Sequence, residues 1–334
     1  MSKDHFRPVL DRAGDLGLFA RGGVNQLPMA LVALDRMGAT PSQVAAFDRH
    51  WRQAYGRPPP PAAGPGVAAL RWREHIRDTA GFPALQAAFQ RHIEAHGAGG
   101  LMTDVWAELH AGIGALAYQA LIRLAYGLEA AHTGETAAGL AALVTGHQTL
   151  GLTRRAAPAC PSVKDGLRQL SRALDGESFG SGAITAAMAS AAQSPRVCRA
   201  FTLAPLDGAD LLAAMSDVAV RLYVQTGDVT VLHMVTATHA LRIVLHALPE
   251  ALARPVERSA WSTFLAAYAS MGAPLLTAQP RPAPPSWDVL LVAARGSRDE
   301  HAIMLTYSCW QEHEVYGGAS YAAAAARGLR LRAV

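Results

Sequence analysis

The sequence predicts an all-α protein, a single helical body spanning residues 1–334 around a central apolar pocket. Apolar side chains recur at three- and four-residue intervals over most of the chain, which is the period of an amphipathic helix. Apolar residues make up 51% of the sequence and charged residues only 17%, a composition that favours a large core or a deep apolar pocket. We find no fixed-period repeat, and single cores can reach this size.

In the first half, local signals mark where the helices begin and end. Asn25 is a candidate N-cap for a helix that carries Pro28 in its first turn, and Thr40 and Pro41 begin the next helix. Uninterrupted apolar periodicity then predicts one long buried helix over residues 103–131. The remaining segments expected to be helical are residues 72–96, with a break near Gly81, and residues 135–150.

The second half continues the helical pattern. Residues 287–294 are expected to be helical, although residues 289–292 could form a short strand. Two proline-rich stretches, near residues 57–66 and 279–285, interrupt the pattern and are expected to form loops. The further segments expected to be helical are residues 164–174, 208–226, 228–248, 255–271, 299–311 and 320–331.

The segment from Val229 to Arg242 places histidines inside an otherwise apolar helix. At about 100° per residue, His239 and Arg242 share one face, whereas His233 lies well away from it. The helix therefore presents histidines to two different neighbours. What those neighbours offer decides between a metal site, an acid–base site and a polar core.

Charge and motif content argue against several function classes. The formal charge is +4, but the arginines are scattered, without the basic stripe typical of nucleic-acid binding. The N-terminus has no signal-peptide core, and residues 272–274 interrupt the longest uncharged run, so neither export nor a membrane span is expected. Three widely separated cysteines fit a reducing cytoplasm. No GxSxG, HExxH, P-loop or GxGxxG motif is present.

Four separated blocks combine polar and apolar residues in a fixed order: Asn25–Leu34, Tyr118–Glu129, His233–Arg242 and Asp299–Met304. In this order they resemble the questin oxidase-like proteins. The resemblance covers nearly the whole chain, and it implies an all-α scaffold and oxidative opening of anthraquinone-type rings, described as Baeyer–Villiger oxidation. A relative in that family resembles a non-haem iron dioxygenase that uses several histidines and a carboxylated lysine.

This sequence departs from the family pattern at three positions. The resemblance implies histidines where Gln26 and Gln119 stand, and a lysine where Met304 stands. An amide is a poor iron ligand beside imidazole, and a thioether replaces neither the charge nor the oxygens of a carbamate. We therefore assign no metal ligand, and the cofactor stays unidentified.

The leading functional expectation is a questin oxidase-like oxidoreductase acting with O2 on an aromatic or polyketide-like small molecule in specialised metabolism. A histidine base would generate a substrate anion, and amide and guanidinium groups would hold oxyanions. Two alternatives stay open: a non-redox cyclase, isomerase or lyase, and a non-catalytic binding protein. The candidate catalytic residues are His233, His239 and His301, and the candidate substrate-binding residues are Asn25, Gln26, Tyr118, Gln119, Arg123, Thr236, Arg242 and Met304.

Overall fold

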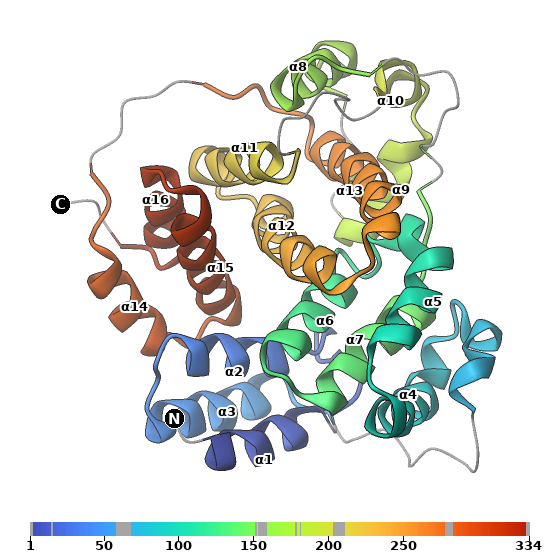
Figure 1. Cartoon of the computed structure of the whole chain (residues 1–334). Helices are drawn as coiled ribbons and strands as arrows, with labels where there is room; N and C mark the ends of the chain where they lie inside the picture. The colour runs from blue at the N-terminus through green and yellow to red at the C-terminus, as the bar shows by residue number, and fades with distance from the viewer. Residues whose placement is uncertain are drawn as a thin grey trace.

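The computed structural model describes residues 3–14, 16–57, 68–150, 152, 159–177, 179–180, 182–202, 211–277 and 283–331. Within these ranges it contains α-helices, short 3-10 turns and one two-stranded antiparallel ribbon, so the predicted all-α class is confirmed (Figure 1). The ribbon pairs β1 (Phe19–Ala20) with β2 (Gly23–Val24). The helices are α1 (Lys3–Gly14), α2 (Leu27–Arg36), α3 (Pro41–Tyr55), α4 (Phe82–His96), α5 (Gly99–Leu109), α6 (Gln119–Glu129), α7 (Thr133–Thr145), α8 (Val163–Leu174), α9 (Ile184–Gln193), α10 (Pro195–Ala200), α11 (Leu211–Thr226), α12 (Val229–Ala247), α13 (Glu250–Ser270), α14 (Trp287–Arg295), α15 (Glu300–Tyr316) and α16 (Ala319–Gly328).

Helix α12 lies at the centre of the molecule and packs against α6, α11, α13 and α15 (Figure 1). Its start is fixed by Asp228, whose carboxylate accepts hydrogen bonds from the backbone N–H groups of Thr230 and Val231. It ends at Ala247, two residues before Pro249, which cannot donate a helical hydrogen bond. Because it is enclosed by helices, α12 has to bury its polar side chains together with its apolar ones.

Helices α6 and α7 approach each other closely because each places a glycine at their interface. A methyl group on Gly139 of α7 would overlap the backbone of Leu124 in α6, and one on Gly127 would overlap the backbone of Thr136. A buried ion pair between Arg123 and Glu135 joins the same two helices. This contact sets the position of α6, whose first residue is Gln119.

One prediction about secondary structure was wrong. The expected long helix over residues 103–131 is broken, because Leu116, Ala117 and Tyr118 take left-handed φ angles of 54°, 56° and 68° before α6 begins. A side chain at Gly114, within the break between α5 and α6, would overlap Thr263 of α13, so tertiary packing overrides an apolar period that runs through the break. The helix expected over residues 287–294 is confirmed as α14, and residues 289–292, for which a strand was the alternative, lie within it with one face packed against α15.

The start of α2 is held by the side chain of Asn25, whereas Gln26, the residue directly before the helix, makes no side-chain capping hydrogen bond. The Asn25 Oδ1 atom accepts a hydrogen bond from Leu27 N, while its Nδ2 atom donates to the carbonyl oxygens of Ala13 and Gly17. Asn25 therefore ties α2 to the end of α1, as well as capping it. The next helix has the predicted start: Thr40 and Gln43 form a reciprocal capping box in front of α3.

Two described cavities bear on the expected central apolar pocket. Between α6, α12 and α13 lies an apolar cavity of only about 10 Å³, lined by residues that include Tyr118, Met234 and Phe264. A larger cleft of about 680 Å³ opens at the surface, where the β1–β2 ribbon, α3 and the start of α15 meet, and charged residues line it. Of these two cavities, the central apolar one is thus the small one, and the larger one lies at the surface and is lined by charged residues.

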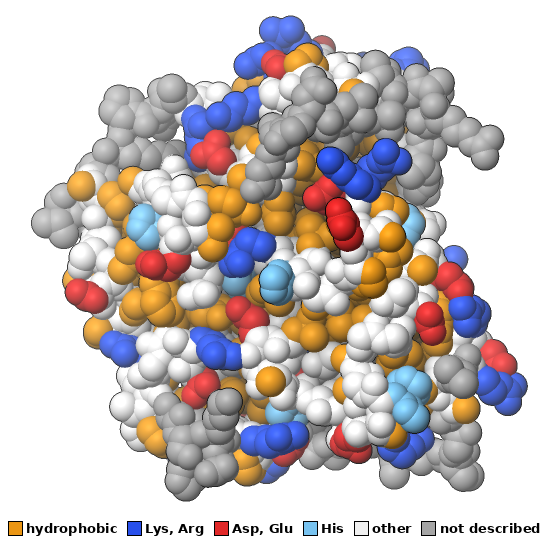
Figure 2. All heavy atoms as spheres, in the orientation of Figure 1, with side chains coloured by type: hydrophobic (Ala, Val, Ile, Leu, Met, Phe, Trp, Pro, Cys, Tyr) orange, Lys and Arg blue, Asp and Glu red, His pale blue; other side chains and the backbone are white. Residues whose placement is uncertain are grey.

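The surface shown in Figure 2 carries lysine and arginine side chains that are separated by acidic, apolar and neutral ones. No long basic stripe is visible on this face, in keeping with the scattered arginines of the sequence.

Most of the two proline-rich stretches, residues 58–67 and 278–282, lies outside the described residues.

Replacing Gly139 with alanine should destabilise the fold, because the new methyl group would push against the α6 backbone. We expect a loss of about 1–3 kcal/mol in the free energy of unfolding, measured by urea denaturation. Gly100→Ala is the matched control, since Gly100 lies in the first turn of α5 with open space around it, and it should be neutral or slightly stabilising. Equal effects at the two positions would contradict this account of the α6–α7 contact.

Candidate active site

Four polar side chains from distant parts of the chain meet between α2, α6, α12 and α15. Gln26 precedes α2, Gln119 is the first residue of α6, His233 lies in the second turn of α12, and His301 lies in the first turn of α15. We call this group the amide–imidazole cluster. Each residue comes from one of the four sequence blocks, so the structure brings together members of every block.

The cluster consists of two amide–imidazole pairs. Gln26 Nε2 lies 3.2 Å from His301 Nε2, and Gln119 Nε2 lies 3.2 Å from His233 Nε2. The two imidazole rings are stacked, with centroids 5.6 Å apart and planes inclined by 14°. An amide nitrogen donates and cannot accept, so each Nε2 atom accepts a hydrogen bond and the ring hydrogen of the neutral imidazole lies on Nδ1.

Burial keeps the inner half of the cluster neutral. Desolvation, reinforced by the proximity of His301, lowers the pKa of His233 to about 3. Within the cluster, the buried amide oxygens Gln26 Oε1 and Gln119 Oε1 have no hydrogen-bond partner among the described residues, whereas the backbone of Ala117 hydrogen-bonds the His233 imidazole. Buried polar atoms are usually paired with protein or water, so the cluster has the capacity to hydrogen-bond a small polar molecule.

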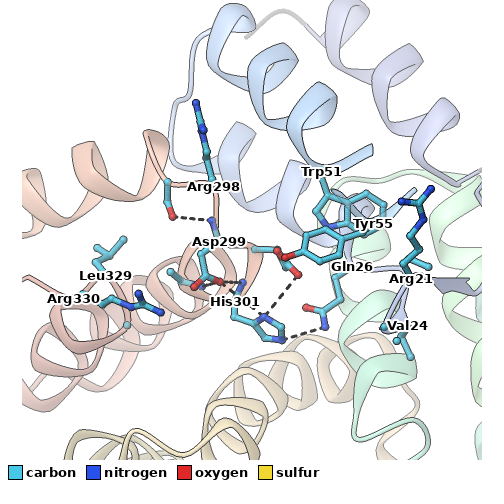
Figure 3. A pocket seen from close by; sticks show the side chains of 17 residues that line it. Arg21, Val24, Gln26, Trp51, Tyr55, Arg298, Asp299, His301, Leu329 and Arg330 are labelled. Carbon is cyan, nitrogen blue, oxygen red and sulfur yellow. Dashed lines mark hydrogen bonds and ion pairs between the residues drawn. The ribbon is translucent and has the colours of Figure 1, made fainter. Parts of the chain in front are cut away.

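The cleft ends on the outer half of the cluster. In Figure 3, Gln26 and His301 point toward each other, while Trp51 and Tyr55 come from α3 and Arg298 and Arg330 come from the opposite side. The cleft therefore combines aromatic surface with guanidinium groups. Its remaining charged lining residues are Arg21, Asp299 and Glu300.

The carboxylate of Glu300 was missed by the sequence analysis. Its side chain is only 12% exposed, and burial raises its pKa, although its own backbone N–H and the nearby His301 oppose the shift. Its negative charge is the largest cause of the raised pKa of Tyr55. The one available signal in the sequence was the position of Glu300 between Asp299 and His301 at a helix start.

His239 occupies a second polar site, away from the cleft. Its Nδ1 atom lies 2.9 Å from Glu312 Oε1, and its Nε2 atom lies 3.8 Å from Glu129 Oε2. Arg242 donates to Glu312 through Nε and Nη2, and the Tyr307 hydroxyl donates to Glu129 over 3.0 Å. The separation of His233 from His239, expected from their angular positions, is borne out.

The other candidate substrate-binding residues make contacts within the protein. Arg123 donates to both oxygens of Glu135 and to the carbonyl of Gly17, and Thr236 bonds to the backbone of its own helix. Asn25 is fully used by backbone groups. The polar groups of these three residues have partners within the protein, as buried polar groups need, and their contact with a substrate stays a prediction.

Tyr118 and Met304 are both buried. Tyr118 lines the small apolar cavity, and its hydroxyl has no described partner. Met304 lies one turn after His301 on α15. Neither residue lines the cleft, and neither do His233, Gln119 and Arg242.

A model of the questin oxidase-like family matches residues 24–309, most of the chain and all of the cluster. The chain belongs to the questin oxidase-like family. Membership suggests a role of the oxidoreductase type. No curated protein matches the chain.

The central helix of this questin oxidase-like protein also meets a simple criterion for a membrane span. By length and apolar composition α12 is the one described helix that could cross a bilayer, but 72% of its apolar window is buried inside the protein. A core helix satisfies the same criterion, and α12 is enclosed by other helices.

The residues present do not fit the iron site that the family resemblance implies. Both Nε2 atoms of the histidine pair already accept hydrogen bonds from glutamine amides, and Met304 supplies a thioether where a carbamate is expected. The chain has two lysines, Lys3 and Lys164, and Lys164 lies on α8 beside Asp217. A hard Fe(II) ion prefers imidazole and carboxylate to this set of donors.

A second group of possible ligands lies at the cleft mouth. Ligand atoms of Asp299, Glu300 and His301 lie within 4.8 Å of one another, which makes them the group of three that stands out among the described residues. Such groups are common at helix starts without an ion, because carboxylates favour the positive end of the helix dipole. We assign no cation to them.

The buried network around His239 should make stability depend on pH. Burial alone lowers the pKa of this imidazole, but Glu129 and Glu312 together raise it to about 8, above the unfolded value of 6.5. Its contribution is therefore complete below pH 6.5 and lost as the pH rises through 8. We expect the free energy of unfolding to fall by about 2 kcal/mol between pH 6 and pH 9.

Urea denaturation at the two pH values measures this loss, and His239→Gln should remove most of it. His246→Gln is the matched control, because His246 is exposed near the end of the same helix. If His239→Gln retained the full pH dependence, another group would have to carry the proton.

Proposed function

We propose that this questin oxidase-like protein is an oxidoreductase that uses O2 to oxidise an aromatic or polyketide-like small molecule in specialised metabolism. The observation that carries the proposal is the cleft of about 680 Å³ that ends on Gln26 and His301 in a chain of this family. A space of this size suits a molecule of several fused rings. The partner is thus a small molecule, and neither nucleic acid nor a membrane surface is required.

The lining of the cleft supports an aromatic substrate with an acidic oxygen. Tyr55 offers exposed ring surface for stacking and lies over the buried Trp51, while Arg21, Arg298 and Arg330 offer positive charge. Guanidinium groups bind phenolate or carboxylate oxygens strongly where water is partly excluded. A substrate anion formed in the cleft would be stabilised by the same groups.

The proposed chemistry needs one proton acceptor and one molecule of O2. Removing a proton from the substrate leaves an electron-rich carbanion or phenolate, and this anion gives one electron to O2. The resulting substrate radical and superoxide combine to a peroxide anion, which takes up a proton. The sum is R–H + O2 → R–OOH, which consumes no external reductant and leaves a hydroperoxide that can open the ring.

We propose that this reaction runs without the family's iron. In support of this, Gln26 and Gln119 engage the histidine nitrogens that a metal would use, and Met304 removes the third ligand. The glutamine amides then serve to orient the imidazoles and to hydrogen-bond oxygen atoms of the substrate or of the peroxide.

Oxygen uptake tests the redox part of the proposal. With polyhydroxylated anthraquinones and related phenols, we expect one O2 consumed per substrate turned over, and 18O2 should label the product. Boiled protein and the His301→Ala variant are the comparisons, and the variant should lose most of the rate. Turnover without oxygen uptake would refute the oxidase assignment and favour a non-redox lyase, isomerase or cyclase. Binding without turnover would favour a non-catalytic binding protein.

Metal analysis tests the iron-free part. Protein purified in the presence of Fe(II) should contain far less than one iron per chain, and chelators should leave its activity unchanged. The double variant Gln26→His, Gln119→His should gain Co(II) binding, seen as visible absorption bands that the parent lacks. Stoichiometric iron, with activity lost on chelation and restored by iron, would refute this part.

A further inference from the structure

Two carboxylates lie at equal distances from His301 but in different surroundings. Asp299 Oδ1 and Glu300 Oε1 are each 3.9 Å from His301 Nδ1. The Asp299 side chain is 50% exposed, and its Oδ1 atom caps α15 by accepting from His301 N and Ala302 N. The Glu300 side chain is 12% exposed and lines the cleft. Asp299 therefore has a structural task, and Glu300 has none that the helix requires.

The opposite edge of the His301 ring is already occupied. Gln26 Nε2 donates to His301 Nε2, so the basic lone pair of the neutral imidazole is engaged and its hydrogen lies on Nδ1. The reverse amide orientation would turn the Nδ1 lone pair toward two carboxylates, which electrostatics disfavours. His301 consequently directs an N–H group toward Glu300 and Asp299.

This arrangement reduces the availability of His301 as a base and leaves a carboxylate facing the substrate space. Glu300 is surrounded by groups from several elements. His301 and Asp299 come from the α15 start, His50 and Tyr55 come from α3, and Arg21, Arg298 and Arg330 line the remaining walls. His301 and His50 favour the ionised form of Glu300 before reaction, while burial allows it to take up a proton readily.

We propose that Glu300 exchanges a proton with the molecule bound in the cleft, and that His301, fixed by Gln26, is the residue that positions Glu300. This inference rests on the proposed oxidation and names its proton acceptor. In the forward step the Glu300 carboxylate removes a proton from R–H, giving the substrate anion and the carboxylic acid. After O2 has added, Glu300 returns that proton to the peroxide anion, so protons balance over the cycle.

The electrostatics of Glu300 agree with this role. Burial is the largest influence on its carboxyl group and raises the pKa, Asp299 adds to the rise, and His301 and His50 oppose it. A carboxylate with a raised pKa is a stronger base, closer to the neutral range where general acid–base catalysis is efficient.

The decisive comparison is Glu300→Gln against Asp299→Asn. Both variants remove one negative charge at the same distance from His301 Nδ1, and asparagine still caps a helix. We expect Glu300→Gln to lower kcat/KM for oxygen uptake by about 10²–10⁴-fold, and Asp299→Asn to change it by less than about threefold. Urea denaturation checks that both variants fold, and Glu300→Asp, which keeps an acid but withdraws it by one methylene, should retain intermediate activity.

A readout that does not need turnover separates this inference from the proposed function. In protein labelled with 13Cδ-glutamate, the resonance missing from Glu300→Gln identifies Glu300, and its midpoint should lie above the ordinary range of glutamate. His301→Asn should raise that midpoint further, because a group that favours the carboxylate is removed.

The positioning role of His301 has its own signature. His301→Asn should shift the acidic limb of the rate profile together with the Glu300 resonance, whereas a purely structural loss would lower the rate at every pH. The inference is overturned if Glu300 titrates in the ordinary range, or if Asp299→Asn loses as much activity as Glu300→Gln. If the protein consumed no oxygen but the titration midpoint of Glu300 were raised and shifted in His301→Asn, the proposed oxidation would be refuted. The inference that Glu300 exchanges a proton and is positioned by His301 would then stand.

Discussion

The buried contact between His239 of α12 and Glu312 of α15 fixes the two helices whose early turns carry His233 and His301. It is an ionic contact without access to water, since both side chains are fully buried, and an unpaired charge in such a position would cost several kcal/mol. Two carboxylates face one imidazolium and one guanidinium, which gives a neutral total only when His239 is protonated. Sliding α15 along α12 would break this balance, so the register that stacks His233 on His301 is held from a distance.

The fixed register of α12 and α15 also explains why the polar residues of these two helices form two layers. His233 and His239 are six residues apart, as are His301 and Tyr307, which corresponds to about 9 Å along a helix. On α12 and α15 the first layer is therefore the histidine pair and the second is the charged network, with Tyr126 and Tyr307 presenting their edges to His239. Aromatic rings around a buried ionic group exclude water, and of the two layers only the first reaches the cleft, through His301.

The helical class and many of the helices could be predicted from the sequence, because apolar period and caps such as Thr40 and Asp228 are local properties. The break at residues 116–118 could not, since the apolar period continues through it and only the contact with α13 reveals it. In the site, four polar residues from separate blocks could be proposed together through a family resemblance. Glu300, Trp51 and the cleft arginines could not, because their convergence depends on how α3 and the α16 end fold against α15. The sequence also could not reveal that Asn25 bonds backbone groups and that Arg123 pairs with Glu135, because those partners are brought close only by the fold.

The left-handed stretch formed by Leu116, Ala117 and Tyr118 stores conformational strain next to the amide–imidazole cluster. Each such residue costs roughly 1 kcal/mol relative to ordinary backbone conformations, and the packing of Gly114 against α13 and of α6 against α7 compensates for that cost. Gln119 follows directly, so its place beside His233 is a balance between local strain and distant packing. Substitutions in this stretch can therefore change how firmly Gln119 is held without altering any residue that contacts the ligand. That separation gives evolution a way to adjust the inner amide–imidazole pair from outside the site.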